Sequence, residues 1–195
     1  MALPDNVLST TPVRGTFAAP DDVRATLLED WEMGGIGISN PSMGLQVQTW
    51  RGYVEGNNIV LSAPSEPPFV VTTDTGITEV SFTFDTNMRP TVVYVAAGVA
   101  KHYWYDAVPE NYVTTTLAAG VTSPMMTHDD KRAGRTTISD ALLFYFRAGN
   151  LCYRQQRDRY NTERVLAALA PGASRIRRVG MTNRLRVQIE YDVLA

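Results

Sequence analysis

Apolar and polar residues alternate along most of the chain after residue 36. The clearest case is residues 142–147, where Leu142, Phe144 and Phe146 alternate with Leu143, Tyr145 and Arg147. A period of two is typical of a β-strand, whose successive side chains point to opposite faces. Ala148-Gly149-Asn150 then predicts a tight turn, because small residues and Asn tolerate left-handed backbone. Residues 151–156 return as a second strand, so the stretch predicts a β-hairpin.

This hairpin has looser copies elsewhere in the chain. Residues 92–105 repeat it, with Tyr94 and Gly98 lying 51 positions before Tyr145 and Gly149. A third copy spans residues 46–61, and half a copy covers residues 185–191. Units of roughly 40–50 residues with four short strands are typical of propeller blades.

The sequence therefore predicts an all-β fold, built from propeller-blade-like repeats of antiparallel strands as an incomplete propeller or a β-sandwich. The N-terminal unit shows no first strand, and a terminal strand pair at residues 175–181 and 185–193 is positioned to supply it and close the circle. Pro64, Pro67 and Pro68 are expected to break the chain before a strand at residues 69–73. Residues 161–169 have helical propensity, but their place in the repeat favours a strand.

Three regions follow from these patterns. Residues 1–20 hold Pro4, Pro12 and Pro20 without sustained periodicity, which predicts an extended N-terminal arm. Residues 21–33 predict one short helix, with acidic residues at its start and apolar residues about four apart. Residues 36–195 form the predicted β-repeat domain.

The charges are distributed unevenly along the chain. Residues 1–130 carry 5 basic and 15 acidic side chains, a net charge of −10, whereas residues 131–195 carry 13 and 5, a net charge of +8. Such a chain favours either head-to-tail joining of copies into a ring or pairing of its two halves within one fold.

The sequence offers little chemistry. We expect no catalytic residues, cofactor or metal site, because the only cysteine is Cys152 and neither histidine lies in a nucleophile motif. His128-Asp129-Asp130 is a weak metal candidate, since adjacent strand residues point to opposite faces. No apolar run is long enough to cross a bilayer and no secretory signal is visible, so we expect no membrane partner. The single cysteine makes assembly in a reducing cytosol the simplest expectation.

Two groups of side chains are candidates for binding. Acidic neighbours interleave with the basic C-terminal strands, which favours a protein–protein interface over nucleic acid. The predicted interface arginines are Arg154, Arg157, Arg159, Arg175, Arg177, Arg178 and Arg186. Aromatic residues that could stack on a sugar ring are Trp50, Tyr103, Trp104 and Tyr105.

Residues 22–32, 44–50, 99–106 and 151–160 resemble small virion-associated proteins of tailed bacteriophages, and the similarity extends over residues 21–193. The resemblance implies a structural, non-enzymatic component of the virion, assembled in the host cytoplasm. It implies a tail protein of the tube, hub, nozzle or fibre-attachment point, present in symmetric copies beside other tail proteins. The alternatives are a glycan-binding module for the host surface and, less favoured, a propeller-type glycan hydrolase.

Overall fold

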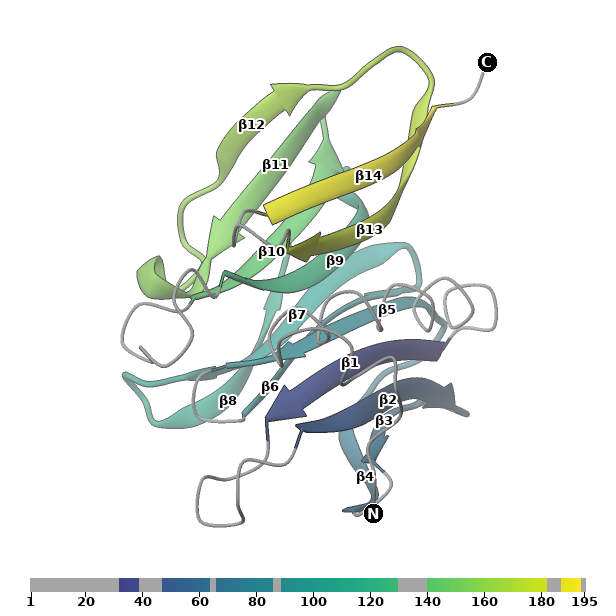
Figure 1. Ribbon diagram of the computed structural model, residues 1–195, viewed down its shortest axis with the longest axis vertical. Helices are drawn as coiled ribbons and strands as arrows, with labels where there is room; N and C mark the ends of the chain where they lie inside the picture. Colours follow the sequence, from purple (N-terminus) through teal and green to yellow (C-terminus); the bar gives the residue numbers. More distant parts are fainter. Residues whose placement is uncertain are drawn as a thin grey trace.

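The computed structural model describes residues 32–38, 47–63, 66–85, 89–129, 140–181 and 187–193. These residues form four antiparallel sheets that follow one another in chain order (Figure 1). The predicted all-β fold class is confirmed. The described residues form no closed propeller. Of the predicted helix, residues 32 and 33 already belong to the first strand, and the rest lies outside the described residues, as does the predicted arm.

Three sheets have the same plan, in which four strands run as a simple meander. Sheet A contains β1 (Glu32–Ile38), β2 (Val47–Glu55), β3 (Asn58–Ala63) and β4 (Glu66–Thr73). Sheet B contains β5 (Ile77–Phe84), β6 (Pro90–Ala96), β7 (Val99–Asp106) and β8 (Asn111–Thr116). Sheet C contains β9 (Thr122–Asp129), β10 (Asp140–Arg147), β11 (Asn150–Gln155) and β12 (Arg164–Ala168), with a short 3-10 helix, η3 (Gln156–Asp158), between its last two strands.

Among the described residues, sheet D consists of two strands, β13 (Ala173–Met181) and β14 (Val187–Val193), which pair with each other. The expectation that this pair completes the N-terminal unit is wrong, because β1 supplies the first strand of sheet A. The sequence around β1 is Glu-Met-Gly-Gly-Ile-Gly-Ile, whose glycines carry no side chain and so hide the alternation of a strand.

Pro67 and Pro68 do not break the chain before residue 69 as predicted, and Pro64 lies outside the described residues. Pro67 and Pro68 lie inside β4, which is the terminal strand of sheet A. The β3–β4 register shifts between Leu61 and Ala63, so both prolines sit at an irregularity of an edge strand. A missing N–H is tolerated at such positions, because no ladder hydrogen bond depends on it. The strand predicted within residues 161–169 is confirmed as β12.

Two hairpins close with the same turn. The central residues are Ala97 and Gly98 in sheet B, with φ of 49° and 77°, and Ala148 and Gly149 in sheet C, with φ of 50° and 73°. Two successive left-handed residues are the requirement of a type I′ turn, which matches the twist of the strands that it joins. The predicted equivalence of the two hairpins is therefore confirmed in backbone geometry.

The core lies between the sheets in three layers. On β6, Val92 and Tyr94 pack toward sheet A, whereas Val93 packs toward sheet C. On β10, Leu143 packs toward sheet B and Phe144 toward sheet D. Sheets B and C are thus covered on both faces, which explains why their second strands, β6 and β10, are buried along nearly their whole length.

The sheets approach one another most closely through their first strands. β1 contacts β5, β5 contacts β9, and β9 contacts β13. Buried serine hydroxyls join these strands, because the Met126 amide donates to Ser81 Oγ at 2.9 Å and the Ile176 amide donates to Ser123 Oγ at 2.7 Å. Gly52 permits the close approach of β2 to sheet B, since a Cβ there would lie 2.8 Å from the Phe82 ring.

Candidate functional site

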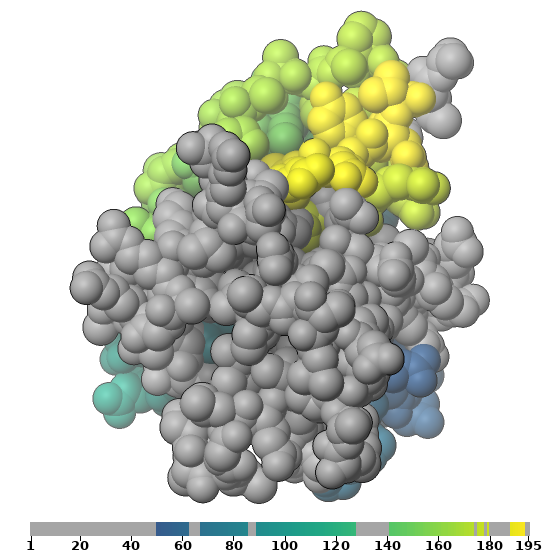
Figure 2. Space-filling model, viewed as in Figure 1, coloured from purple at the N-terminus to yellow at the C-terminus, as the bar shows by residue number. Residues whose placement is uncertain are grey.

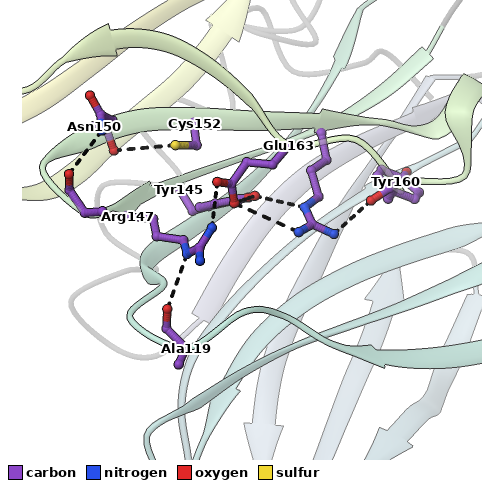
Figure 3. Close-up of polar contacts among 9 residues, drawn as sticks. Ala119, Tyr145, Arg147, Asn150, Cys152, Tyr160 and Glu163 are labelled. Carbon is purple, nitrogen blue, oxygen red and sulfur yellow. Dashed lines mark hydrogen bonds and ion pairs between the residues drawn. The ribbon is translucent and has the colours of Figure 1, made fainter.

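A cluster of hydrogen-bonded polar side chains lies around the hairpin that β10 and β11 form in sheet C (Figure 3). The Tyr145 hydroxyl donates to Glu163 Oε2 at 2.8 Å, and Arg147 Nη1 donates to Glu163 Oε1 at 2.7 Å. Arg154 Nε donates to the Tyr145 hydroxyl at 2.9 Å, and Arg154 Nη1 donates to the Tyr160 carbonyl at 2.9 Å. Arg154, predicted at an interface, is therefore engaged within the fold.

The electrostatics of this cluster are balanced. Burial, together with the Glu163 carboxylate, raises the pKa of Tyr145 to about 12. Burial alone would raise the pKa of Glu163, but hydrogen bonds from Tyr145 and Arg147 outweigh it and hold that pKa below its usual value. The carboxylate is ionised and its tyrosine neutral at physiological pH, which suits a structural clasp rather than proton transfer.

Arg159 holds sheet C against sheet B. It follows η3 with a left-handed φ of 58°, and its Nε donates to Asp106 Oδ1 at 3.1 Å while its Nη2 pairs with Asp106 Oδ2. Asp106 is buried at the end of β7, and the Arg159 guanidinium lowers its pKa. A second predicted interface arginine is thus an internal link between two units.

The other predicted interface arginines divide into two groups. Arg157, Arg175 and Arg177 are exposed, and Arg177 Nε pairs with Asp192 at 2.9 Å across β13 and β14. The side chains of Arg178 and Arg186 lie outside what the structure describes. Of these arginines, the exposed ones therefore lie on η3 and β13.

The four predicted stacking aromatics do not share one face. Trp50 is half-buried between Phe69 and Phe84, with ring centroids 6.0 and 5.1 Å away. Trp104 is buried between sheets B and C, where its Nε1 donates to Thr115 Oγ1 at 3.3 Å. Strand alternation places Trp104 on the opposite face of β7 from Tyr103 and Tyr105.

Tyr103 and Tyr105 do gather into one cluster, joined by a residue that sequence reasoning missed. Tyr112 of β8 stacks on Tyr103 at 4.9 Å between ring centroids and meets the edge of Tyr105 at 5.3 Å. The Arg89 guanidinium carbon lies 3.9 Å from the Tyr105 ring centroid. Tyr112 lies directly opposite Tyr105 in the β7–β8 register, so the pairing of these strands was the signal that could have found it.

A cavity of about 220 Å³ lies between sheets B and C, lined among others by His102, Trp104, Asp106, Arg154, Arg159 and Tyr160. Burial and the nearby charge of Arg154 lower the pKa of His102 to about 3, so its imidazole is neutral at physiological pH. His102 Nε2 lies 2.8 Å from Thr91 Oγ1. Asp106 pairs with Arg159, and Arg154 is bonded to Tyr145, so this acid and these two cations are engaged within the fold, whereas His102 Nδ1 is buried without a hydrogen-bond partner.

The described residues contain no group of three or more His, Cys, Asp and Glu side chains that could hold a metal ion. The side chains of His128 and Asp129 lie outside the described set. Cys152 is buried, and burial raises the pKa of its thiol, which disfavours the reactive thiolate. In the part of the chain that the structure describes, no helix is long and apolar enough to cross a membrane.

No protein-family model, curated protein or solved structure matches this chain. The order of the sheets, the uneven distribution of charge and the exposed side chains are therefore the features that bear on function.

Proposed function

We propose that this chain is a structural subunit of a bacteriophage virion, a tail protein of the tube, hub, nozzle or fibre-attachment point that assembles in several symmetric copies. The observation that carries this proposal is the open series of sheets, which ends in a two-stranded sheet after three sheets of four strands. Two-stranded sheets have little stability of their own, so sheet D is the natural place for further strands or another subunit.

In this proposal each sheet is a blade of an incomplete propeller. Three properties support it, namely the meander order of each sheet, the contacts between successive first strands and the repeated turns at Gly98 and Gly149. The alternative within the same fold class is a stack of sheets that stays open, and both architectures leave the end of the series for neighbours.

The charges support association of copies end to end. Residues 32–121, which form sheets A and B, carry 3 basic and 8 acidic side chains, whereas residues 122–195 carry 13 and 7. Sheet A lies at one end of the long axis and sheet B next to it, whereas the green and yellow atoms of sheets C and D gather at the other end (Figure 1 and Figure 2). Exposed Arg175 and Arg177 of β13 and exposed Glu55 and Glu110 in the acidic half are suitable for such contacts, and Arg175 also interacts electrostatically with Glu79 of sheet B. We assign a second contact to the N-terminal arm at residues 1–20, which lies outside the described residues.

A glycan-binding role is less well supported. The rings of Tyr103 and Tyr112 cover one face of each other, Arg89 covers Tyr105, and Trp104 is buried, so few aromatic faces are left for a sugar. A glycan array with the full chain separates the two roles, because a pure scaffold binds no glycan on it.

The proposal is tested on purified particles of the phage whose genome encodes the chain. Quantitative mass spectrometry of washed particles should find the chain in several copies per particle. Particles that contain the other tail proteins but lack this chain would refute a virion role. Arg175→Glu combined with Arg177→Glu should reduce incorporation, whereas Arg51→Glu, an exposed arginine of the acidic half, is the matched control and should not.

A further inference from the structure

Strand β12 is the terminal strand of sheet C and pairs with β11 alone among the described strands. Its sequence, Arg-Val-Leu-Ala-Ala, contains four apolar residues in a row. Val165 is 62% exposed and Leu166 53% exposed, and Ala167 and Ala168 are exposed as well. Both faces of the strand are therefore open, so β12 projects beyond the sheets on either side of it.

The equivalent outer strands of sheets A and B are protected against pairing. β4 carries Pro67 and Pro68, which have no N–H to donate to another strand. β8 exposes Thr114, Thr115 and Thr116, whose hydroxyls keep that edge polar. β12 has neither proline nor an exposed polar run, and its only irregularity is the register shift that leaves Leu166 without a partner on β11.

The charges around β12 are neutralised within the chain. Arg164 Nη1 pairs with Asp158 Oδ2 at 2.7 Å, and Arg147 pairs with Glu163. An edge without net charge does not favour a charged partner, and it permits contact with an identical edge without like-charge repulsion.

The strand is also complementary to itself in size. Antiparallel pairing about a two-fold axis sets the start of one copy against the end of the other. The larger Val165 and Leu166 of each copy then meet the smaller Ala167 and Ala168 of its mate, so the side chains interleave.

We propose that β12 is a dimerisation edge, at which β12 of a second copy of this chain adds in antiparallel orientation and joins two C sheets into one. The inference names one partner surface of the assembly in the proposed function and rests on that proposal for its biological role. Five residues per copy bury little area, so the contact belongs to the weak, concentration-dependent class.

Sedimentation of the full-length chain over a concentration series tests the pairing. The unmodified chain should pass from monomer to dimer as its concentration rises. Leu166→Lys should weaken the dimer by on the order of a hundredfold, because each dimer then holds two ammonium groups at a desolvated contact. The matched control is Val70→Lys on the proline-containing edge of β4, which is also 53% exposed and should leave the dimer unchanged.

Cysteine cross-linking supplies a second readout that does not depend on weakening the dimer. Facing residues of antiparallel strands lie roughly 4.5–5.5 Å apart at Cα, within the range of a disulfide. A mixture of Leu166→Cys chains with Ala167→Cys chains should give a disulfide dimer in a glutathione buffer, because residue 166 of one copy faces residue 167 of its mate. The Val70→Cys chain should not, and buried Cys152 is too shielded to compete.

A chain that stays monomeric, a dimer that Leu166→Lys leaves intact, or cross-linking no faster at residues 166 and 167 than at residue 70 would each overturn the proposal. These measurements use the isolated chain. Their failure would leave the virion role open, and absence of the chain from particles would leave the pairing intact.

Discussion

Sheets B and C have the same order of strands but differ in the residue that accepts the hydrogen bond of an equivalent buried tyrosine. Tyr94 and Tyr145 occupy equivalent positions, are 1% and 0% exposed, and each donates its hydroxyl to a carboxylate. Tyr94 reaches Asp74, which lies in the connection from sheet A and pairs with Lys101. Tyr145 instead reaches Glu163, which lies in the connection between η3 and β12 (Figure 3).

The same alternation of strand residues thus repeats with different polar partners. The burial of an equivalent tyrosine is determined by the strand pattern, which the two units share. Its carboxylate is supplied from whichever loop passes nearby, and in sheet B that loop ties two sheets together. The Asp74 contact is the longer one at 3.3 Å, against 2.8 Å for Glu163. We infer that the hydroxyl contributes more in sheet C.

The largest expected effect concerns the apolar positions just before these tyrosines. Leu143→Ala should lower the free energy of unfolding by roughly 2–5 kcal/mol, because Leu143 is 0% exposed between sheets B and C. Val92→Ala, at the equivalent position of sheet B, should cost about half as much, since it removes fewer buried carbons. Urea denaturation of both variants measures the ratio, and a larger loss for Val92→Ala would contradict the equivalence.

Sheet B should be the acid-sensitive unit. His102 has a pKa of about 3 in the folded chain and about 6.5 when unfolded, so acid favours the unfolded state, which binds the proton more tightly. This contribution to stability is complete above pH 6.5 and is lost as the pH falls toward 3, with a slope of about 1.4 kcal/mol per pH unit. Denaturation midpoints from pH 7 to 4 measure it.

The comparison with sheet C supplies the control, because Tyr153 occupies the position equivalent to His102 and carries a phenol in place of the imidazole. His102→Gln should flatten the profile between pH 6.5 and 4, whereas Tyr153→Phe should leave it steep. A native profile that is already flat in this interval would contradict the burial of a neutral imidazole.

The hydroxyls themselves are compared by removing them one at a time. Tyr145→Phe should cost about 1–3 kcal/mol, because Arg154 and Glu163 each lose a hydrogen bond in a half-buried cluster. Tyr94→Phe should cost about 0.5–1.5 kcal/mol, since its bond is longer and Asp74 keeps Lys101. Thermal unfolding ranks the pair, and equal losses would show that the difference in partners carries no energetic weight.

The smallest expected effect on stability concerns the two turns, and it should be equal in sheets B and C. Ala97→Asn and Ala148→Asn should each raise stability by about 0.5–1 kcal/mol, because both alanines hold left-handed φ values that Asn adopts more readily. Chemical denaturation measures the gain. A gain at only one turn would indicate that the two hairpins are under different strain.

The alternation of buried and exposed positions was enough to place most strands. The hairpin predicted at residues 142–156 corresponds to β10 and β11, and both alanine–glycine turns lie where their small residues predicted them. Sequence reasoning missed β1, because glycines hide its pattern, and it misjudged Pro67 and Pro68, because a proline's effect depends on whether its strand lies at an edge.

The candidate sites were harder to predict, because they depend on which sheets face each other. Arginine is common in protein–protein interfaces, which is why Arg154 and Arg159 were predicted there. Their partners, Tyr145 and Asp106, instead come from other strands of the same chain. Trp104 and Tyr105 are neighbours in sequence, but only the packing of sheet C on sheet B determines which of them is covered. The open edge at β12 depends equally on the strand order, which no local pattern contains.

The central claim is that this chain is a repeated structural subunit, and a reconstruction of the intact particle tests it most directly. If the chain is such a subunit, the reconstruction should show several copies of it related by rotational symmetry. Density of neighbouring molecules should lie against β12 and against the exposed arginines of β13. A particle without this chain, or with a single copy that touches no neighbour along these strands, would contradict it.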